Sequence, residues 1–216
     1  MMKLLIVAAS GGLGSRVVHE ALARGHSVTC LARSKAKLIE AVGVDVLPRI
    51  QFVIGDGTDR QAVEKAADGV DAIISCGPSL PSLAKTLGEV CKESNQCKKV
   101  VITAGASNIL EVDGSSHHLR FGQEGTGFFN YHAPAIEAFK ATGVVYGIWC
   151  PGLMKPGKKS ASEVKLSDRA IVDGHKSYDF ITYEDAANVI IRATESPEWN
   201  NQHFAAISKV TTTQEL

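Results

Sequence analysis

A glycine-rich turn near the N-terminus has the residue pattern with the clearest chemical meaning. An initial apolar run is followed by Ser10, Gly11, Gly12, Leu13 and Gly14, and an amphipathic pattern starts at Leu13. Glycines let backbone amides come close to a phosphate, and a helix N-terminus adds the positive end of its dipole. A strand, a glycine turn and a helix in this order predict a site for the pyrophosphate of a dinucleotide. The alternative is a merely flexible turn.

Basic residues follow the second apolar run of the chain. Chains that select NAD often have an acidic residue here, which accepts hydrogen bonds from the ribose hydroxyls. This sequence instead has Arg33, Ser34 and, one helical turn later, Lys37. A guanidinium, a hydroxyl and an ammonium can together bind a 2′-phosphate, so we predict NADP(H) as the cofactor. The alternative, a solvated basic end of the following helix, leaves the missing acid unexplained.

Short runs rich in valine and isoleucine alternate with helical patterns up to Trp149. We expect strands at Lys3–Ala9, Ser27–Ala32, Ile50–Ile54, Asp71–Ser75, Lys99–Thr103 and Val144–Trp149. Helical spacing predicts helices at Leu13–Arg24, Lys35–Val42, Arg60–Ala67, Ser79–Ser94 and Asn130–Thr142. Continuous apolar runs are typical of strands that are covered on both faces. The order predicts an α/β fold of the Rossmann type, a doubly wound, mostly parallel sheet with helices on both faces.

The rest of the chain is too short to form a separate domain. We expect a strand at Tyr178–Ile181, a helix at Tyr183–Glu195 with Thr182 and Asp185 spaced as a capping box, and a strand near His203–Ile207. We therefore predict one domain over residues 1–216, in which residues 151–216 complete the substrate side. Two long irregular stretches, Asn108–Phe128 and Pro151–Asp173, follow strand ends on the ligand side and are typical of binding loops or lids.

Composition excludes several classes of protein and favours others. Lys plus Arg and Asp plus Glu both number 23, so no overall charge favours nucleic acid or a membrane surface. No apolar stretch reaches the roughly 18 to 20 residues of a membrane span, so we expect a soluble protein. The five cysteines lack C-x-x-C spacing and are typical of reduced thiols in a cytoplasmic protein. Adjacent His117 and His118 seldom bind one metal ion without a matching acid or cysteine, so we expect no metal site.

Several motifs after the expected strands carry a family resemblance. They are Gly55-Asp56-Gly57, Cys76-Gly77-Pro78, Thr103-Ala104-Gly105-Ala106-Ser107, Pro151-Gly152-Leu153 and, later, Phe180–Ala187. Together with the glycine-rich turn, in which Ala8 stands at the usual first glycine, they resemble the atypical short-chain dehydrogenase/reductase family. The most similar branch contains the NmrA-like regulators and the flavin reductase (biliverdin-IXβ reductase)-like enzymes. The resemblance implies cofactor contacts from Asp56, Gly57, Cys76, Gly77, Pro78, Thr103, Ala104, Gly105, Pro151, Gly152 and Leu153.

The usual catalytic pair of this superfamily, Tyr-x-x-x-Lys, is absent. Tyr131 is followed four residues later by Ala135. The flavin reductase-like branch instead implies a serine after the fifth strand and a histidine near the start of the next helix, which correspond to Ser107 and His132. Tyr131 competes with His132 as proton donor. The structural alternative is that Ser107 ends a strand and His132 is a polar surface residue.

Three functions remain open at this point. The first is an NADPH-dependent reductase that places a small planar acceptor, such as a flavin, quinone or conjugated carbonyl, against the nicotinamide. The second is a non-catalytic NADP(H)-binding regulator of the NmrA-like kind, which the missing Tyr-Lys pair favours. The third, an epimerase or isomerase, requires a base that the sequence does not clearly show. The oligomeric state, monomer or homodimer, stays open.

Overall fold

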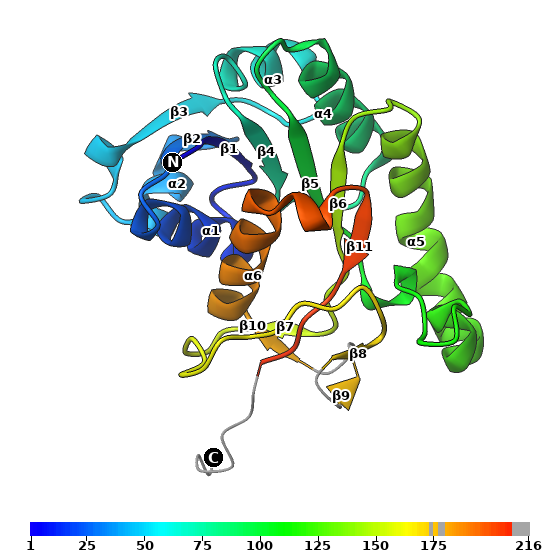
Figure 1. Cartoon of the computed structure of the whole chain (residues 1–216). Helices are drawn as coiled ribbons and strands as arrows, with labels where there is room; N and C mark the ends of the chain where they lie inside the picture. The colour runs from blue at the N-terminus through cyan, green and yellow to red at the C-terminus, as the bar shows by residue number, and fades with distance from the viewer. Residues whose placement is uncertain (173–174, 177–179, 209–216) are drawn as a thin grey trace.

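A seven-stranded parallel sheet forms the centre of the protein (Figure 1). The structure is a computed structural model that describes residues 1–172, 175–176 and 180–208. The strand order is β11 (Gln202–Phe204), β6 (Tyr146–Trp149), β5 (Lys99–Thr103), β4 (Ala72–Ser75), β1 (Lys3–Val7), β2 (Ser27–Ala32) and β3 (Ile50–Ile54). All six neighbouring pairs are parallel. The prediction of a doubly wound α/β fold is confirmed.

Helices cover both faces of this sheet, and each face has its own core. One core contains residues of α1 (Gly12–Ala23), α2 (Lys35–Val42) and α6 (Tyr183–Glu195); the other contains residues of α3 (Arg60–Ala66), α4 (Pro81–Glu93) and α5 (Gly122–Lys140). Strand β1 serves both, because alternate side chains point to opposite faces. Leu4 and Ile6 lie in the first core, and Leu5 and Val7 lie in the second. This two-sided burial explains why β1 is continuously apolar.

The strand order reverses between β1 and β4. From β1 the chain proceeds outward through β2 to β3, and it then crosses back to β4 on the other side of β1. Connections that leave β1 and β4 in opposite directions open a crevice at the carboxyl ends of these strands. The fold therefore provides a ligand crevice beside the glycine-rich turn.

Helix α5 begins earlier than expected. It starts at Gly122 rather than Asn130, so His132 lies well inside the helix and not in its first turn. The three glycines between Gly122 and Gly127 lower helix propensity and hide the start in the sequence. The irregular stretch before the helix is correspondingly shorter and contains two 3-10 helices, Ala106–Asn108 and His117–Phe121.

The C-terminal part adds the edge strand β11 and two small sheets. Strand β7 (Met154–Lys155) pairs in parallel with β10 (Ile181–Thr182), and β8 (Ile171–Val172) pairs with β9 (His175–Lys176). The expected strand at Tyr178–Ile181 begins outside the described residues. No helix in the described part of the chain is both long and apolar enough to cross a bilayer.

The start of α6 only partly forms the expected capping box. Thr182 Oγ1 accepts from the backbone N–H of Asp185 at 3.1 Å, which confirms the cap. The carboxylate of Asp185 does not return this bond. It accepts from both the N–H and the hydroxyl of Ser160 and from the hydroxyl of Ser208, and Ser208 in turn accepts from the Thr182 N–H. This buried carboxylate therefore joins three separate chain segments.

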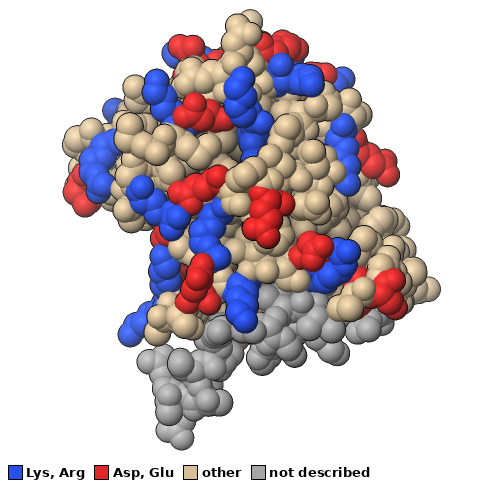
Figure 2. Space-filling view, viewed as in Figure 1, with Lys and Arg blue, Asp and Glu red and all other residues tan. Residues whose placement is uncertain are grey.

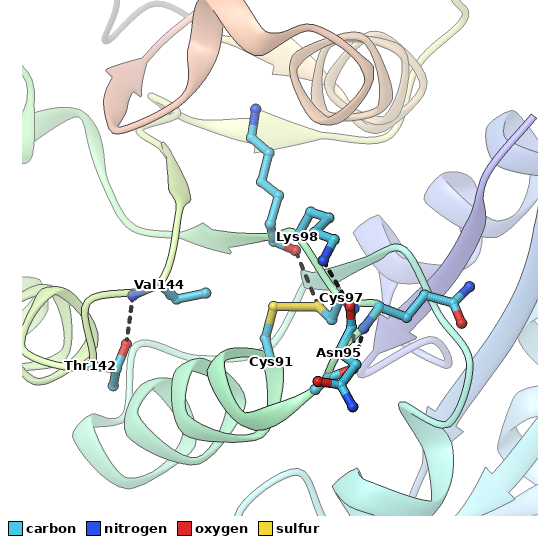
Figure 3. The surroundings of a disulfide bond; sticks show 9 residues. Cys91, Asn95, Cys97, Lys98, Thr142 and Val144 are labelled. Carbon is cyan, nitrogen blue, oxygen red and sulfur yellow. Dashed lines mark hydrogen bonds between the residues drawn. A yellow bond between two sulfur atoms is a disulfide. The ribbon is translucent and has the colours of Figure 1, made fainter.

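The expectation of five reduced thiols is wrong for two cysteines. Cys91 and Cys97 form a disulfide between the end of α4 and the segment before β5 (Figure 3). The turn that brings them together depends on Ser94, whose Oγ accepts from the N–H groups of Gln96 and Cys97. A spacing of six residues does not reveal such a turn. The cysteines consequently no longer support a reducing compartment.

A buried lysine connects β5 to the end of α6, and it provides a stability test. Lys99 is 5% exposed, and its Nζ donates to the carbonyl oxygens of Ala193 and Ser196 at 2.7 and 3.1 Å. Burial lowers the pKa of this lysine to about 8.

We expect Lys99→Met to lower the free energy of unfolding by about 1–3 kcal/mol, because carbonyls at a helix C-terminus lose their cationic donor. Urea unfolding measures this change, and the exposed Lys98→Met is the control, with a change within about 0.5 kcal/mol. Equal losses in both variants would contradict the expectation.

Candidate functional site

The turn after β1 has a backbone conformation that normally requires glycine. Ala8 has φ +60°, in the left-handed region. The Gly11 N–H donates to the Ala8 carbonyl at 3.0 Å and closes the turn. A side chain in this conformation costs about 1–2 kcal/mol. This explains why strand β1 ends at Val7, two residues before its expected end, and why Ala8 occupies a position at which the family usually has glycine.

The three glycines of the turn have different roles. A Cβ on Gly14 would lie 2.3 Å from the carbonyl oxygen of Ala8, whereas a Cβ on Gly11 would lie 3.3 Å from the same oxygen. Gly14 therefore allows helix α1 to pack against the end of β1. A Cβ on Gly12 would lie 3.3 Å from the ring of Tyr183, at the start of α6. Gly11 and Gly12 are both exposed, and a Cβ on either would avoid a prohibitive backbone clash, but of the two only Gly11 lines the cavity beside this turn.

The N-terminus of α1 is suited to an anion. Its N-cap is Gly11, no side chain caps it, and no acidic residue lies in its first turn. The first N–H groups of a helix have no partner within the helix. An anion at this point would accept from these amides and would interact favourably with the helix dipole.

A cavity of about 370 Å³ adjoins this turn at the carboxyl ends of β1 to β4. Eight of the predicted cofactor residues line it: Ser10, Gly11, Arg33, Lys37, Asp56, Gly57, Gly77 and Pro78. Val7, Ala8, Leu31, Ala32, Gly55, Thr58, Leu80 and Leu83 complete the lining. The other predicted cofactor residues lie outside this cavity: Gly12, Leu13, Gly14, Ser34, Cys76, Thr103, Ala104, Gly105, Pro151, Gly152 and Leu153. The lining thus combines apolar leucine side chains with glycine turns, and Leu83 lies directly beside Gly57 and Gly77.

Two cations that follow β2 in the chain line the cavity. Arg33 and Lys37 are exposed, and neither lies within 4 Å of a carboxylate oxygen among the described residues. Ser34 has a different role from the predicted one, because its Oγ caps α2 by accepting from the Lys37 N–H at 3.3 Å. The pKa of Asp56 is lowered mainly by hydrogen bonds from the N–H and hydroxyl of Thr58, with a smaller contribution from the charge of Arg33. A negative ligand group beside the start of α2 would meet two available cations.

A hydrogen-bonded chain crosses from β4 to α5 at the other side of the crevice. Thr103 Oγ1 donates to the Ser75 carbonyl at 3.0 Å, and Ser79 Oγ donates to the Thr103 carbonyl at 2.9 Å. Ser79 Oγ also lies 2.6 Å from Nδ1 of His132. The sequence analysis did not select Ser79. The only signal for it is its place directly after the Cys76-Gly77-Pro78 motif, at a strand end that faces ligands.

His132 is half-buried beside the turn that follows β5. Burial lowers the pKa of its imidazole below the ordinary value. A Cβ on Gly105 would lie 2.7 Å from Nε2 of this ring, so the glycine makes room for it. Tyr131 is 57% exposed, and its ring meets the His132 ring edge-on at 4.9 Å between centroids. The structure thus brings Tyr131, His132, Ser79 and Gly105 together.

Ser107 lies two residues beyond Gly105, in a 3-10 helix that packs against α5. It is buried there, and its Oγ donates to Asn108 Oδ1 at 3.2 Å. Asn108 lines a second cavity of about 420 Å³, between α5 and β11, that also contains Lys140 and His203. No hydrogen bond between described residues joins Ser107 to His132. The arrangement favours the structural alternative for Ser107.

The remaining candidate residues have ordinary partners. Burial raises the pKa of the Cys76 thiol to about 12, so this group stays protonated near neutral pH. His117 pairs through Nδ1 with Glu111 at 2.5 Å, and the ring of His118 stacks on Phe129 at 4.1 Å. Within the described ranges, no cluster of three or more His, Cys, Asp or Glu residues is arranged to hold a metal. The Pro151 carbonyl accepts from Ala106 N–H at 2.8 Å and links the turns after β5 and β6.

Comparisons with known proteins agree with this geometry. A family model described as NAD(P)H-binding matches residues 8–197. The uncharacterized protein YwnB of Bacillus subtilis (strain 168) is 23% identical over 225 residues, which cover 96% of this chain and 99% of YwnB. ChuY, an anaerobillin reductase from Escherichia coli O157:H7, has a TM-score of 0.71 at 17% identity, with 99% of this chain and 100% of ChuY covered. A short-chain dehydrogenase/reductase from Veillonella parvula DSM 2008 in complex with NADP has a TM-score of 0.75 at 12% identity, and the match covers 97% of this chain and 96% of that protein. The chain therefore belongs to the NAD(P)H-binding family, and its fold is that of the solved short-chain dehydrogenase/reductase.

Proposed function

We propose that this protein is an NADPH-dependent reductase of a small planar acceptor, such as a flavin, a quinone or a conjugated carbonyl compound. The observation that carries the proposal is the position of His132, a half-buried imidazole beside the strand ends that adjoin the dinucleotide cavity. A bound nicotinamide would supply hydride chemistry. The chain's own residues would bind the cofactor, orient the acceptor and exchange one proton at His132.

The residues of the cavity fit the proposed cofactor. The amides at the N-terminus of α1 can bind the pyrophosphate, and Arg33 and Lys37 can bind the 2′-phosphate. The leucine side chains of the lining suit the adenine ring. The presence of two cations, in addition to the helix N-terminus, in the surroundings of one cavity supports NADPH over NADH as the proposal.

The acceptor would bind beyond β5, next to His132. Tyr131 is 57% exposed, and its ring beside His132 offers apolar surface on this side. A planar acceptor can stack on an aromatic ring, which supports the substrate class proposed here. Acidic and basic side chains are interspersed over the face shown in Figure 2, which gives no broad one-sign field on that face. A small acceptor is therefore the proposed partner.

Replacing His132 tests the proton-transfer role. With NADPH and an acceptor identified in a panel of flavins, quinones and enals, we expect His132→Gln to lower turnover about 100-fold, because a general acid is lost. The dissociation constant of NADPH should stay unchanged, since His132 does not line the cofactor cavity. Tyr131→Phe is the matched control for the adjacent hydroxyl. Full activity in His132→Gln with reduced activity in Tyr131→Phe would assign the proton donor to Tyr131 instead.

The pH dependence of kcat/KM should also show the titration of His132. Burial lowers the pKa of His132, so the ring gives up its proton at a pH below the usual value of about 6.5. Reduction uses the protonated form, and kcat/KM should therefore fall as pH rises through this lowered pKa and reach a limit of tenfold per pH unit. His132→Gln should flatten this limb of the profile. An unchanged limb in the variant would exclude His132 as its origin.

A non-catalytic regulator that senses NADP(H) is the second candidate. The observation in its favour is that Tyr131 is followed by Ala135 rather than lysine, so the usual catalytic pair is missing. Such a protein would bind NADPH with the same residues and would consume none of it with any acceptor. Absorbance loss at the nicotinamide band distinguishes the two candidates directly.

A further inference from the structure

Ser79 has two hydrogen-bonding neighbours, but its hydroxyl has only one hydrogen. Its Oγ lies 2.9 Å from the Thr103 carbonyl oxygen and 2.6 Å from Nδ1 of His132. The carbonyl can only accept, whereas Nδ1 can donate or accept according to the tautomer. Both contacts are satisfied only if Ser79 donates to Thr103 and accepts from an Nδ1–H of His132. The reverse arrangement would direct a hydroxyl lone pair at the carbonyl lone pairs across a 2.9 Å contact.

The hydrogen bond at Nδ1 decides which form the other ring nitrogen, Nε2, takes. With hydrogen on Nδ1, neutral His132 has a lone pair on Nε2. This atom lies beside Gly105, 2.7 Å from the position that a Cβ on this glycine would take. Protonation adds a hydrogen at Nε2 and leaves the Nδ1–H bond to Ser79 intact. The Ser79 contact is thus compatible with both charge states of the ring.

Among the residues that the structure describes, no group other than Ser79 forms a hydrogen bond with a ring nitrogen of His132. The contacts from neighbouring elements are Ser79, the backbone at Gly105 and the ring of Tyr131. Among the described residues, no acidic side chain lies within 4 Å of the ring nitrogens, and burial is the recorded cause of its lowered pKa. The tautomer of a histidine is set by the hydrogen bond that one of its ring nitrogens makes. In His132 this bond is the one between Nδ1 and Ser79.

We infer that Ser79 is a positioning residue, which holds His132 with hydrogen on Nδ1 and leaves Nε2 as the atom at which the site gives up or takes up a proton. The catalytic consequence rests on the proposed reductase function. The tautomer does not, because it follows from the contacts of the free protein. Ser79 thereby orients the histidine for transfer without touching the acceptor itself.

Nitrogen chemical shifts of the histidine side chains test the tautomer without any activity. In protein labelled with ¹⁵N-histidine at pH 7.5, long-range ¹H–¹⁵N correlation separates the two neutral tautomers, and His132→Gln identifies the signal among the seven histidines. We expect the wild type to show hydrogen on Nδ1. Ser79→Ala should shift the signal toward the other tautomer, and Ser79→Thr, which keeps the hydroxyl, should restore it. Ser82→Ala, an exposed serine nearby, is the control.

Two outcomes would overturn the inference. One is hydrogen on Nε2 in the wild type, and the other is an unchanged His132 signal in folded Ser79→Ala. Gly105→Ala provides an independent perturbation, since its methyl group would displace Nε2, and it should also alter the signal.

Kinetics then separate this inference from the proposed function. With an acceptor that the wild type reduces, Ser79→Ala should lower kcat roughly tenfold and leave the NADPH dissociation constant unchanged. If the nitrogen shifts behave as expected but no acceptor is reduced, the positioning role stands and the reductase proposal fails. If kcat is unchanged in a variant whose tautomer has changed, the catalytic role of Nε2 is wrong.

Discussion

Gly14→Val is expected to lower the free energy of unfolding by about 3 kcal/mol or more and to abolish cofactor binding as a consequence. A Cβ on Gly14 would lie 2.3 Å from the Ala8 carbonyl oxygen and 2.9 Å from the Ala9 Cα. Both are backbone atoms between a central strand and the first helix, so they cannot move aside like a flexible side chain. Overpacking of this kind commonly costs 1–3 kcal/mol, and a backbone clash lies at the upper end.

Gly11→Ala is the matched variant that separates folding from binding. Its Cβ would lie 3.3 Å from the same carbonyl, and Gly11 has φ −80°, which alanine readily adopts. We expect stability within about 1 kcal/mol of the wild type. The methyl group would still stand at the N-cap of α1 and line the cavity, so NADPH affinity should fall about tenfold or more. Thermal unfolding and calorimetric titration measure the two effects. A stable Gly14→Val protein would contradict the expected clash, and a folded Gly11→Ala protein with unchanged NADPH affinity would remove the dinucleotide site from this turn.

Much of the fold could be predicted because strand burial leaves a strong sequence signal. β1 reads as Leu4, Leu5, Ile6 and Val7, all nearly fully buried, because both faces of the central strands are covered. The start of α5 could not be predicted in the same way. Its first turns contain three glycines, and its position depends on tertiary packing rather than on local propensity.

In the candidate site too, the features that are local in sequence could be predicted, and the contacts between distant residues could not. The glycine-rich turn and the cations Arg33 and Lys37 are local in sequence, and the structure places Gly11, Arg33 and Lys37 around one cavity. The pairing of Ser79 with His132 joins residues 53 apart, and no periodicity encodes such a contact. The same reason applies to the disulfide of Cys91 and Cys97, which depends on the turn made by Ser94.

A preference for NADPH over NADH is expected to be about ten- to a thousandfold in Kd, and Arg33→Asp is expected to narrow or reverse it. The guanidinium of Arg33 can bind two phosphate oxygens, and the Lys37 ammonium adds a second charge. A charge-assisted hydrogen bond contributes roughly 1.5–3 kcal/mol, and about 1.4 kcal/mol corresponds to tenfold in affinity. Both side chains are exposed, so solvent screening reduces their effect.

The structure sharpens this test, because Ser34 caps α2 and is not available as an independent phosphate ligand. The preference should therefore depend on the two cations, and Lys37→Met should reduce it by a smaller factor than Arg33→Asp, since a point charge lacks the bidentate fork. Aspartate at position 33 would repel a phosphate and accept hydrogen bonds from ribose hydroxyls, as in NAD-selective chains.

Titrations with both cofactors at low salt and at several hundred millimolar salt measure the effect, and the wild-type preference should shrink as salt rises. Lys35→Met is the matched control, because Lys35 lies over the Phe52 ring and outside the cavity lining. Equal dissociation constants for NADPH and NADH in the wild type at low salt would show that these cations do not select the cofactor.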